Sequence, residues 1–134
     1  MDKIKELFNG DALARHLGME LLELNPGRSV TRMTVGGEHL NLFGMAHGGI
    51  IFTLADFAFE AACNSHGTVS VALNVNISYI KPAGPGTLTA TAEEISCSGR
   101  IGTYDIRVTD GNDSLVAHFH GTAYRKRDPL PGLE

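Results

Sequence analysis

The spacing of hydrophobic residues changes along the chain from a helical period to a strand period. Residues 50–63 hold only three polar side chains, Thr53, Asp56 and Glu60, and their spacings of three and four place them on one stripe of a helix. The other faces are apolar, so the pattern predicts a helix that is buried around most of its circumference. Glycines precede this segment and an Asn-Ser-His-Gly sequence follows it, as expected for the two ends of a helix.

After this helix, apolar and polar residues alternate between Val69 and Tyr79, which predicts a long strand with one apolar face. Residues 4–17 form a short, interrupted helical segment. The other expected strands lie between turn-forming residues and cover residues 19–25, 28–35, 87–96, 100–109 and 114–125. One sheet around one helix is an α+β domain, which spans residues 1–134. Residues 128–134 contain two prolines and are expected to form a disordered tail.

Composition and charge limit the kinds of binding partner and the cellular location that we expect for this protein. The chain has 134 residues, of which 43% are hydrophobic and 19% charged, as is typical of one globular domain. Its net charge of -4 indicates no general affinity for nucleic acid or an anionic membrane. We find no signal-peptide pattern and no apolar run of about 18 residues that could span a membrane. Two cysteines are too few for a disulfide framework, so we expect a cytoplasmic protein.

Asp56 is the main candidate for chemistry, because it is a carboxylate on an otherwise apolar helix. Burial raises the pKa of a carboxyl group, which makes such a residue a candidate base or nucleophile near neutral pH. The alternative is that Asp56 marks the solvent-exposed side of an amphipathic helix.

The start of the same helix offers a second candidate group. Gly48 and Gly49 leave the first backbone N–H groups open to close approach, a geometry that can bind an oxyanion. Alternatively, these glycines only relieve strain where the helix begins. Gly48 and Asp56 are about 12 Å apart along a helix, so they cannot reach one reacting carbon from the same chain. Either they are unrelated, or two antiparallel copies of the helix form two shared sites across a two-fold axis.

At these residues the sequence resembles a known family. N-L-F-G-M-A-H-G-G-I-I-F-T-L-A-D, residues 41–56, is similar to the signature of hotdog-fold thioesterases of the phenylacetic acid degradation (PaaI) type. The Asn stands six residues before His-Gly-Gly and the Asp nine residues after the His. Residues 71–83 and 120–125 resemble later strands of that family. The resemblance implies a hotdog fold, in which a curved antiparallel sheet wraps around one long helix and the sheets of a dimer join edge to edge.

The resemblance also implies hydrolysis of acyl-CoA thioesters, with aromatic (phenylacetyl-CoA-like) or medium-size acyl groups and without a cofactor. Asp56 would be the general base or the nucleophile, the Gly48 N–H would stabilise the oxyanion, and Asn41 would orient the thioester carbonyl. His47 and Gly49 would support this substrate-binding loop. Taken from the residues alone, Asn41 could equally satisfy the backbone of its own loop.

Further substrate contacts follow from the resemblance. It implies that pantetheine lies near Tyr79 and residues 97–102, which include Ser98, Gly99 and Arg100. Phosphate groups favour Arg and Lys, so we expect Arg100 to contact the CoA phosphates. The alternative for Arg100 is a solvated surface charge.

The sequence departs from part of the family at Ala72, where some relatives place a Ser that helps to hold the water. Thr53 or Asn74 could supply the missing hydroxyl or amide. His118 and His120 share a strand face, as metal ligands often do, but a third protein ligand would have to come from elsewhere in the chain. We therefore expect polar histidines there and no metal site.

Two other classes of function stay open: a hotdog dehydratase or hydratase, and a non-catalytic acyl-CoA-binding regulatory module. The pattern of Asn41, Gly48 and Asp56 disfavours the first class, and retention of Asp56 disfavours the second. A nucleophilic Cys63 would need a partner base and a lowered pKa. We expect a homo-oligomer, built from dimers with shared active sites and assembled as a tetramer of two dimers.

Overall fold

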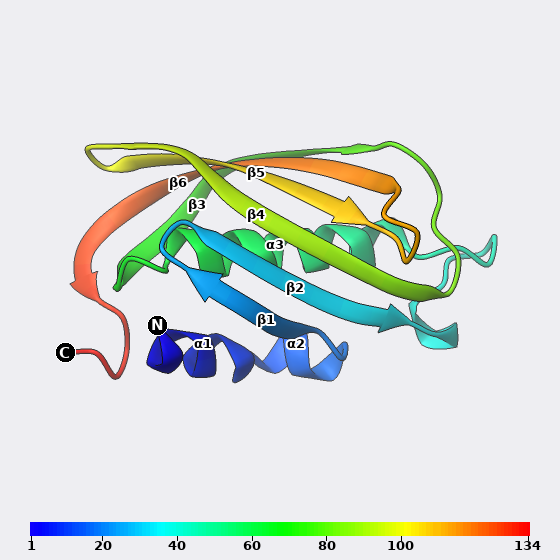
Figure 1. Ribbon diagram of the computed structural model, residues 1–134, viewed down its shortest axis with the longest axis horizontal. Helices are drawn as coiled ribbons and strands as arrows, with labels where there is room; N and C mark the ends of the chain where they lie inside the picture. Colours follow the sequence, from blue (N-terminus) through cyan, green and yellow to red (C-terminus); the bar gives the residue numbers. More distant parts are fainter.

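The computed structural model describes residues 1–134 and contains one six-stranded antiparallel sheet curved around a long helix (Figure 1). The helix is α3 (Gly48–Cys63), and the sheet order is β1-β2-β4-β5-β6-β3. The strands are β1 (Glu20–Asn25), β2 (Arg28–Val35), β3 (Thr68–Tyr79), β4 (Gly86–Ser98), β5 (Ile101–Thr109) and β6 (Leu115–Pro129). Three short helical elements complete the chain: α1 (Asp2–Asn9), α2 (Ala12–His16) and η1 (Gly37–His39). None of the helices is long and apolar enough to cross a membrane.

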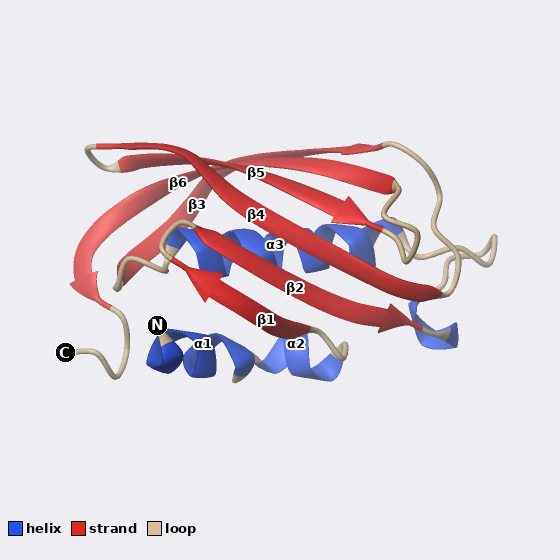
Figure 2. Cartoon of the chain, in the orientation of Figure 1, coloured by secondary structure: helices blue, strands red, loops and turns tan.

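The apolar faces of α3 form the centre of the core, as the hydrophobic pattern predicts. Nine of its residues are buried, and they pack beneath the strands that arch over the helix in Figure 2. The Phe59 ring lies between Tyr104 and Phe119, with centroid distances of 5.6 and 5.8 Å. A Cβ atom at Gly121 would come within 2.6 Å of the Phe59 ring, so the sheet approaches the helix closely only because residue 121 is glycine.

The sheet also binds the helix through buried hydroxyl groups. Ser29 and Thr31 on β2 donate hydrogen bonds to the backbone oxygens of Ala58 and Leu54, at 2.5 and 3.2 Å. Both hydroxyls are fully buried and therefore need these partners. They fix the position of α3 on the sheet and thereby the position of Asp56.

The α+β class and the hotdog arrangement predicted from the sequence are confirmed, and so is the number of strands. Strands β4 and β6 end at Ser98 and Pro129, beyond the predicted ends at residues 96 and 125. Strand β6 includes Asp128 and Pro129, and the next residue, Leu130, is 3% exposed and donates its N–H to the Gly67 oxygen at 3.1 Å. The expected disordered tail is therefore corrected for residues 128–130, where an apolar side chain that packs into the core outweighs the flanking prolines.

The two edges of the sheet differ. Edge strand β1 is met by the end of α1, because the Asn9 side chain exchanges two hydrogen bonds with the Leu21 backbone, at 2.8 and 3.1 Å. Edge strand β3 pairs only with β6 and exposes Val71, Leu73 and Tyr79 by 45, 56 and 52%. An open edge that carries exposed apolar side chains is a template for pairing with another strand.

Candidate active site

The N-terminus of α3 leaves one backbone donor free. His47 is the N-cap, and its Nδ1 accepts the Gly49 N–H at 3.0 Å. The Ile50 and Ile51 N–H groups donate to the His47 oxygen. Gly48 is the remaining residue of the first turn, and its N–H has no acceptor within the chain. The cap therefore uses the neighbouring donors and leaves the Gly48 N–H without an acceptor in the chain, a geometry that can bind an oxyanion.

Asn41 lines the same groove as Gly48, and its side-chain oxygen accepts hydrogen bonds from the backbone of its own loop. Its Oδ1 accepts the N–H groups of Phe43 and Met45, at 2.9 and 3.1 Å. This is the loop-backbone role that the sequence left as an alternative. Its Nδ2 has no acceptor in the chain, so the same side chain can still donate to a substrate carbonyl.

These groups line a groove of about 570 Å³ at the N-terminal end of α3, which we call the N-terminal groove. Tyr79 lies in it and donates its hydroxyl to the Gly48 oxygen at 2.9 Å. The other lining residues are mainly apolar: Asn41, Phe43, Met45, Ala46, Gly48, Ile51, Ile80, Lys81 and Pro82. One chain thus brings Asn41 to the start of α3 near Gly48, as the sequence predicted, and it adds Tyr79 to the same groove.

Asp56 lies in a separate groove of about 320 Å³, which we call the carboxylate groove. It is lined by Asp56, Phe59, Glu60, Cys63, Ser70, Val71 and Ala72. Burial raises the pKa of Asp56, and repulsion from Asp11 raises it further. Asp56 therefore lies in an environment that favours a base or nucleophile over an inert surface carboxylate.

The structure answers two questions about the missing strand hydroxyl. Ala72 lines the carboxylate groove, so the position without a hydroxyl does face Asp56. Thr53 cannot replace it, because its Oγ1 donates to the Gly49 oxygen at 2.7 Å and stays on the helix backbone. Asn74 is exposed and does not line this groove, whereas Ser70 does. Ser70 was not among the residues that the sequence suggested.

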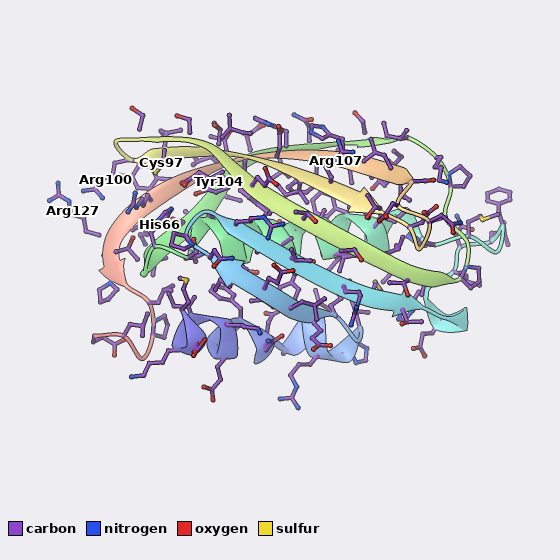
Figure 3. The ribbon with its side chains drawn as sticks, viewed as in Figure 1. His66, Cys97, Arg100, Tyr104, Arg107 and Arg127 are labelled. Atoms are coloured by element: carbon purple, nitrogen blue, oxygen red, sulfur yellow. The ribbon has the colours of Figure 1, made fainter.

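A third groove, which we call the basic cradle, has a volume of about 430 Å³ and is lined by Thr68, Gly99, Arg100, Arg125, Lys126 and Arg127. Figure 3 shows Arg100, Arg127 and Cys97 together at one end of the molecule. The Arg100 guanidinium donates to the Arg125 oxygen at 3.3 Å, which ties the turn after β4 to β6. Ser98 ends β4 at this turn but does not line the cradle.

The expected substrate contacts are not all brought together in one chain. Arg125, next to Arg100, pairs with Ser70 near the start of β3, whereas Tyr79 ends that strand. Tyr79 lies nine positions after Ser70 on this strand, which is about 30 Å at 3.3 Å per residue. Within one subunit, Tyr79 and Arg100 therefore lie far apart, and their contacts with pantetheine and the CoA phosphates stay a prediction.

Two minor candidates are explained by local chemistry. Burial raises the pKa of the Cys63 thiol to about 12, so it is protonated and a poor nucleophile at neutral pH. His118 and His120 both face Asp105, with nitrogen-to-oxygen distances of 3.3 and 3.2 Å. They are polar residues of a strand face, as the sequence suggested.

The fold is an antiparallel sheet around one helix. That helix carries a backbone N–H without an acceptor and a carboxyl group with a raised pKa, a combination that indicates a hotdog-type hydrolase. Residues 43–117 match the family described as Thioesterase superfamily. The acyl-coenzyme A thioesterase PaaI of Escherichia coli is 38% identical over 94% of this chain and 91% of its own length. A protein of Archaeoglobus fulgidus described as a putative esterase is 38% identical over 98% of this chain and 86% of its own length.

Solved structures agree with these sequence matches. The structure of the Escherichia coli PaaI protein, from the phenylacetic acid degradation operon, superposes with a TM-score of 0.89 and 37% identity, and covers 92% of this chain and 91% of that chain. A Streptococcus mutans protein bound to acetyl-CoA superposes with a TM-score of 0.78 and 27% identity, over 83% of this chain and 90% of that chain. The chain belongs to the thioesterase superfamily and is a thioester hydrolase.

Proposed function

We propose that this thioesterase hydrolyses acyl-CoA thioesters, with aromatic or medium-size acyl groups, to the free acid and CoA. The main support comes from two groups on α3. The Gly48 N–H at the start of the helix has no acceptor in the chain, and two turns later the Asp56 carboxyl group has a raised pKa. The name of the Escherichia coli relative and the acetyl-CoA in the Streptococcus mutans structure support CoA as the leaving group.

In the proposed mechanism, the thioester oxygen accepts hydrogen bonds from the Gly48 N–H and the Asn41 amide of one subunit. Both donors stabilise the negative charge that develops on this oxygen as the carbonyl carbon becomes tetrahedral. Asp56 of the partner subunit activates a water as general base, or attacks the carbonyl carbon itself. His47 is a positioning residue, because it caps the helix and occupies the Gly49 N–H.

The two halves of the site would meet in a dimer formed through strand β3. This edge is open, exposes apolar side chains and borders the carboxylate groove through Ser70, Val71 and Ala72. Pairing of two β3 edges would place the two α3 helices antiparallel, with Gly48 of one subunit facing Asp56 of the other. We also propose that two dimers form a tetramer and that the protein acts in the cytoplasm.

The basic cradle is the proposed site for the CoA phosphates. Three arginines and one lysine line it, and no acidic residue does. The Thr68 hydroxyl oxygen is buried without a hydrogen-bond partner, and Thr68 lines the same groove. In this proposal Arg100 shares the phosphate role with Arg125, Lys126 and Arg127, which lie near the end of β6.

The N-terminal groove is the proposed acyl site. Its walls include Phe43, Met45, Ile51 and Ile80, and Phe43 is 83% exposed in the single chain. An exposed aromatic side chain next to the oxyanion donor can close over a flat, apolar acyl group. This lining supports aromatic or medium-size acyl groups over very short ones.

A panel of CoA thioesters tests the function. We expect thiol release from phenylacetyl-CoA and medium-chain acyl-CoAs to exceed release from acetyl-CoA in kcat/KM, with Asp56→Asn as the inactive control. Hydration of an enoyl-CoA without thiol release would indicate a hydratase. Tight binding without turnover of any acyl-CoA would indicate a binding module.

A further inference from the structure

The carboxylate groove contains a second acid that the proposed mechanism does not use. Glu60 follows Asp56 by four residues, so the two side chains lie on one helix face with Cβ atoms about 5–6 Å apart. Both line the groove, and no Lys, Arg or His lines it with them. Neither carboxyl group takes part in an ion pair.

The surroundings of Glu60 favour its neutral form. Asp56 and Cys63 face it from α3, and Asp11 acts on it from the start of α2. Strand β3 contributes only uncharged residues to the groove. Burial raises the pKa of Glu60 to about 7, and repulsion from Asp11 and Asp56 adds to the effect. Two like charges on one helix face without a cation disfavour ionisation of both carboxyl groups, so Glu60 is the group of this pair to which we assign the proton.

Glu60 also lies on the side of Asp56 where the leaving group would depart. Asn64 is the C-cap of helix α3, and its side chain exchanges hydrogen bonds with the Ser70 backbone at 2.8 and 3.2 Å. Ser70 in turn pairs with Arg125 of the basic cradle. Glu60 is one helical turn nearer to this end than Asp56, about 6 Å along the axis. A CoA thioester with its phosphates in the cradle and its carbonyl at Asp56 would therefore direct its sulfur toward Glu60.

We propose that Glu60 is the acid that protonates the departing thiolate, a role that rests on the proposed function. On the general-base route, Asp56 takes a proton from water as the water oxygen attacks the carbonyl carbon. When the C–S bond breaks, its electron pair goes to sulfur, and the Glu60 proton moves to that sulfur. The products are the carboxylic acid and the CoA thiol. A proton transfer from Asp56 to Glu60 then restores the starting state.

The test compares two leaving groups in the variant Glu60→Gln. An alkyl thiolate such as CoA is a poor leaving group that benefits from protonation, whereas an aryl thiolate is stable enough to depart without it. We expect Glu60→Gln to lower kcat about 10²-fold for the CoA thioester at pH 7 and less than about tenfold for the aryl thioester of the same acid. Glu20→Gln on the exposed face of β1 is the matched control and should leave both rates unchanged.

The pH profile gives a second readout. Wild-type kcat for the CoA thioester should fall as pH rises above about 7, because Glu60 then loses its proton. This alkaline decline should vanish in Glu60→Gln and persist in Glu60→Asp, which keeps a shorter acid. The Glu60 carboxyl group takes part in no hydrogen bond or ion pair within the chain, so Gln, which has nearly the same shape, should preserve the fold, as thermal unfolding would verify.

Equal losses on the two leaving groups would overturn the proposal and make Glu60 a positioning residue for Asp56. An active wild type with an unaltered Glu60→Gln profile would also overturn it, while leaving the thioesterase function intact. An inactive wild type would instead overturn the proposed function and this role with it.

Discussion

A mixed dimer built from two inactive chains tests whether the active site is shared between subunits. One chain carries Asp56→Asn, which removes the base or nucleophile. The other carries Asn41→Asp, which keeps the Oδ1 that holds the loop but replaces the Nδ2 donor. Each change should lower kcat about 10²-fold in its own homodimer, because each removes a group that acts on the reacting carbonyl.

The expected recovery follows from the geometry of α3. If Asn41 of one subunit works with Asp56 of its partner, one site of the mixed dimer contains both lesions and the other contains none. The mixed dimer should then have about half the wild-type activity, by two-fold symmetry. Random exchange of equal amounts makes about half of all dimers mixed, so the mixture should recover about a quarter of wild-type activity. This exceeds the parental activities of about 1% by more than tenfold.

Thiol release from a CoA thioester, before and after verified subunit exchange, is the assay. Wild-type chains taken through the same exchange are the control for losses during dissociation. If Asn41 and Asp56 acted within one chain, each site of the mixed dimer would contain one lesion and activity would stay at the parental level. Verified exchange without recovery would therefore refute the shared site and the pairing of these residues at the thioester.

Three further changes test separate parts of the molecule. Asp56→Asn should keep acyl-CoA binding, measured by calorimetry, while kcat falls about 10²-fold or more; near wild-type turnover would remove Asp56 from the mechanism. Arg100→Ala should raise KM for a CoA thioester and spare a pantetheine thioester without the nucleotide phosphates; equal effects on both would make Arg100 structural. Gly121→Ala should cost about 1–3 kcal/mol in urea unfolding, because its Cβ would overlap the buried Phe59 ring. Phe59→Leu in the same chain should recover part of that loss, and an unchanged unfolding midpoint for Gly121→Ala would contradict the close approach.

The secondary structure could be predicted from the sequence because each element shows a strong hydrophobic period. Helix α3 is apolar around most of its circumference, and hydrophobic and polar residues alternate along β3. These two patterns together favour a sheet packed around one buried helix. The end of β6 could not be predicted in the same way. It depends on Leu130 packing into the core and on a backbone hydrogen bond to Gly67, which is 63 residues away in sequence (130 minus 67).

The candidate site was predictable where its residues are close in sequence. The segment from Asn41 to Asp56 contains the oxyanion donor, the amide and the carboxylate, so a motif of fixed spacing finds them. The basic cradle joins Thr68, the β4–β5 turn and the end of β6, and no local pattern signals that these segments meet. The sequence places Glu60 on the polar stripe of the helix, but only the structure shows that it lies in a groove without a cationic side chain.

The pairing of Gly48 with Asp56 also fixes where the two-fold axis would pass. In two antiparallel helices, facing positions have residue numbers with a constant sum, here about 104, so the axis passes close to Phe52. Glu60 would then lie one helical turn further from the axis than Asp56, toward the end of α3 next to the basic cradle. In the proposed dimer, the Glu60 acid, the Asn41 amide and the Asp56 carboxylate would converge on one thioester only when both subunits contribute, although each chain contains all three groups. A single chain keeps them in separate grooves, so the proposed shared site predicts that hydrolysis requires a dimer.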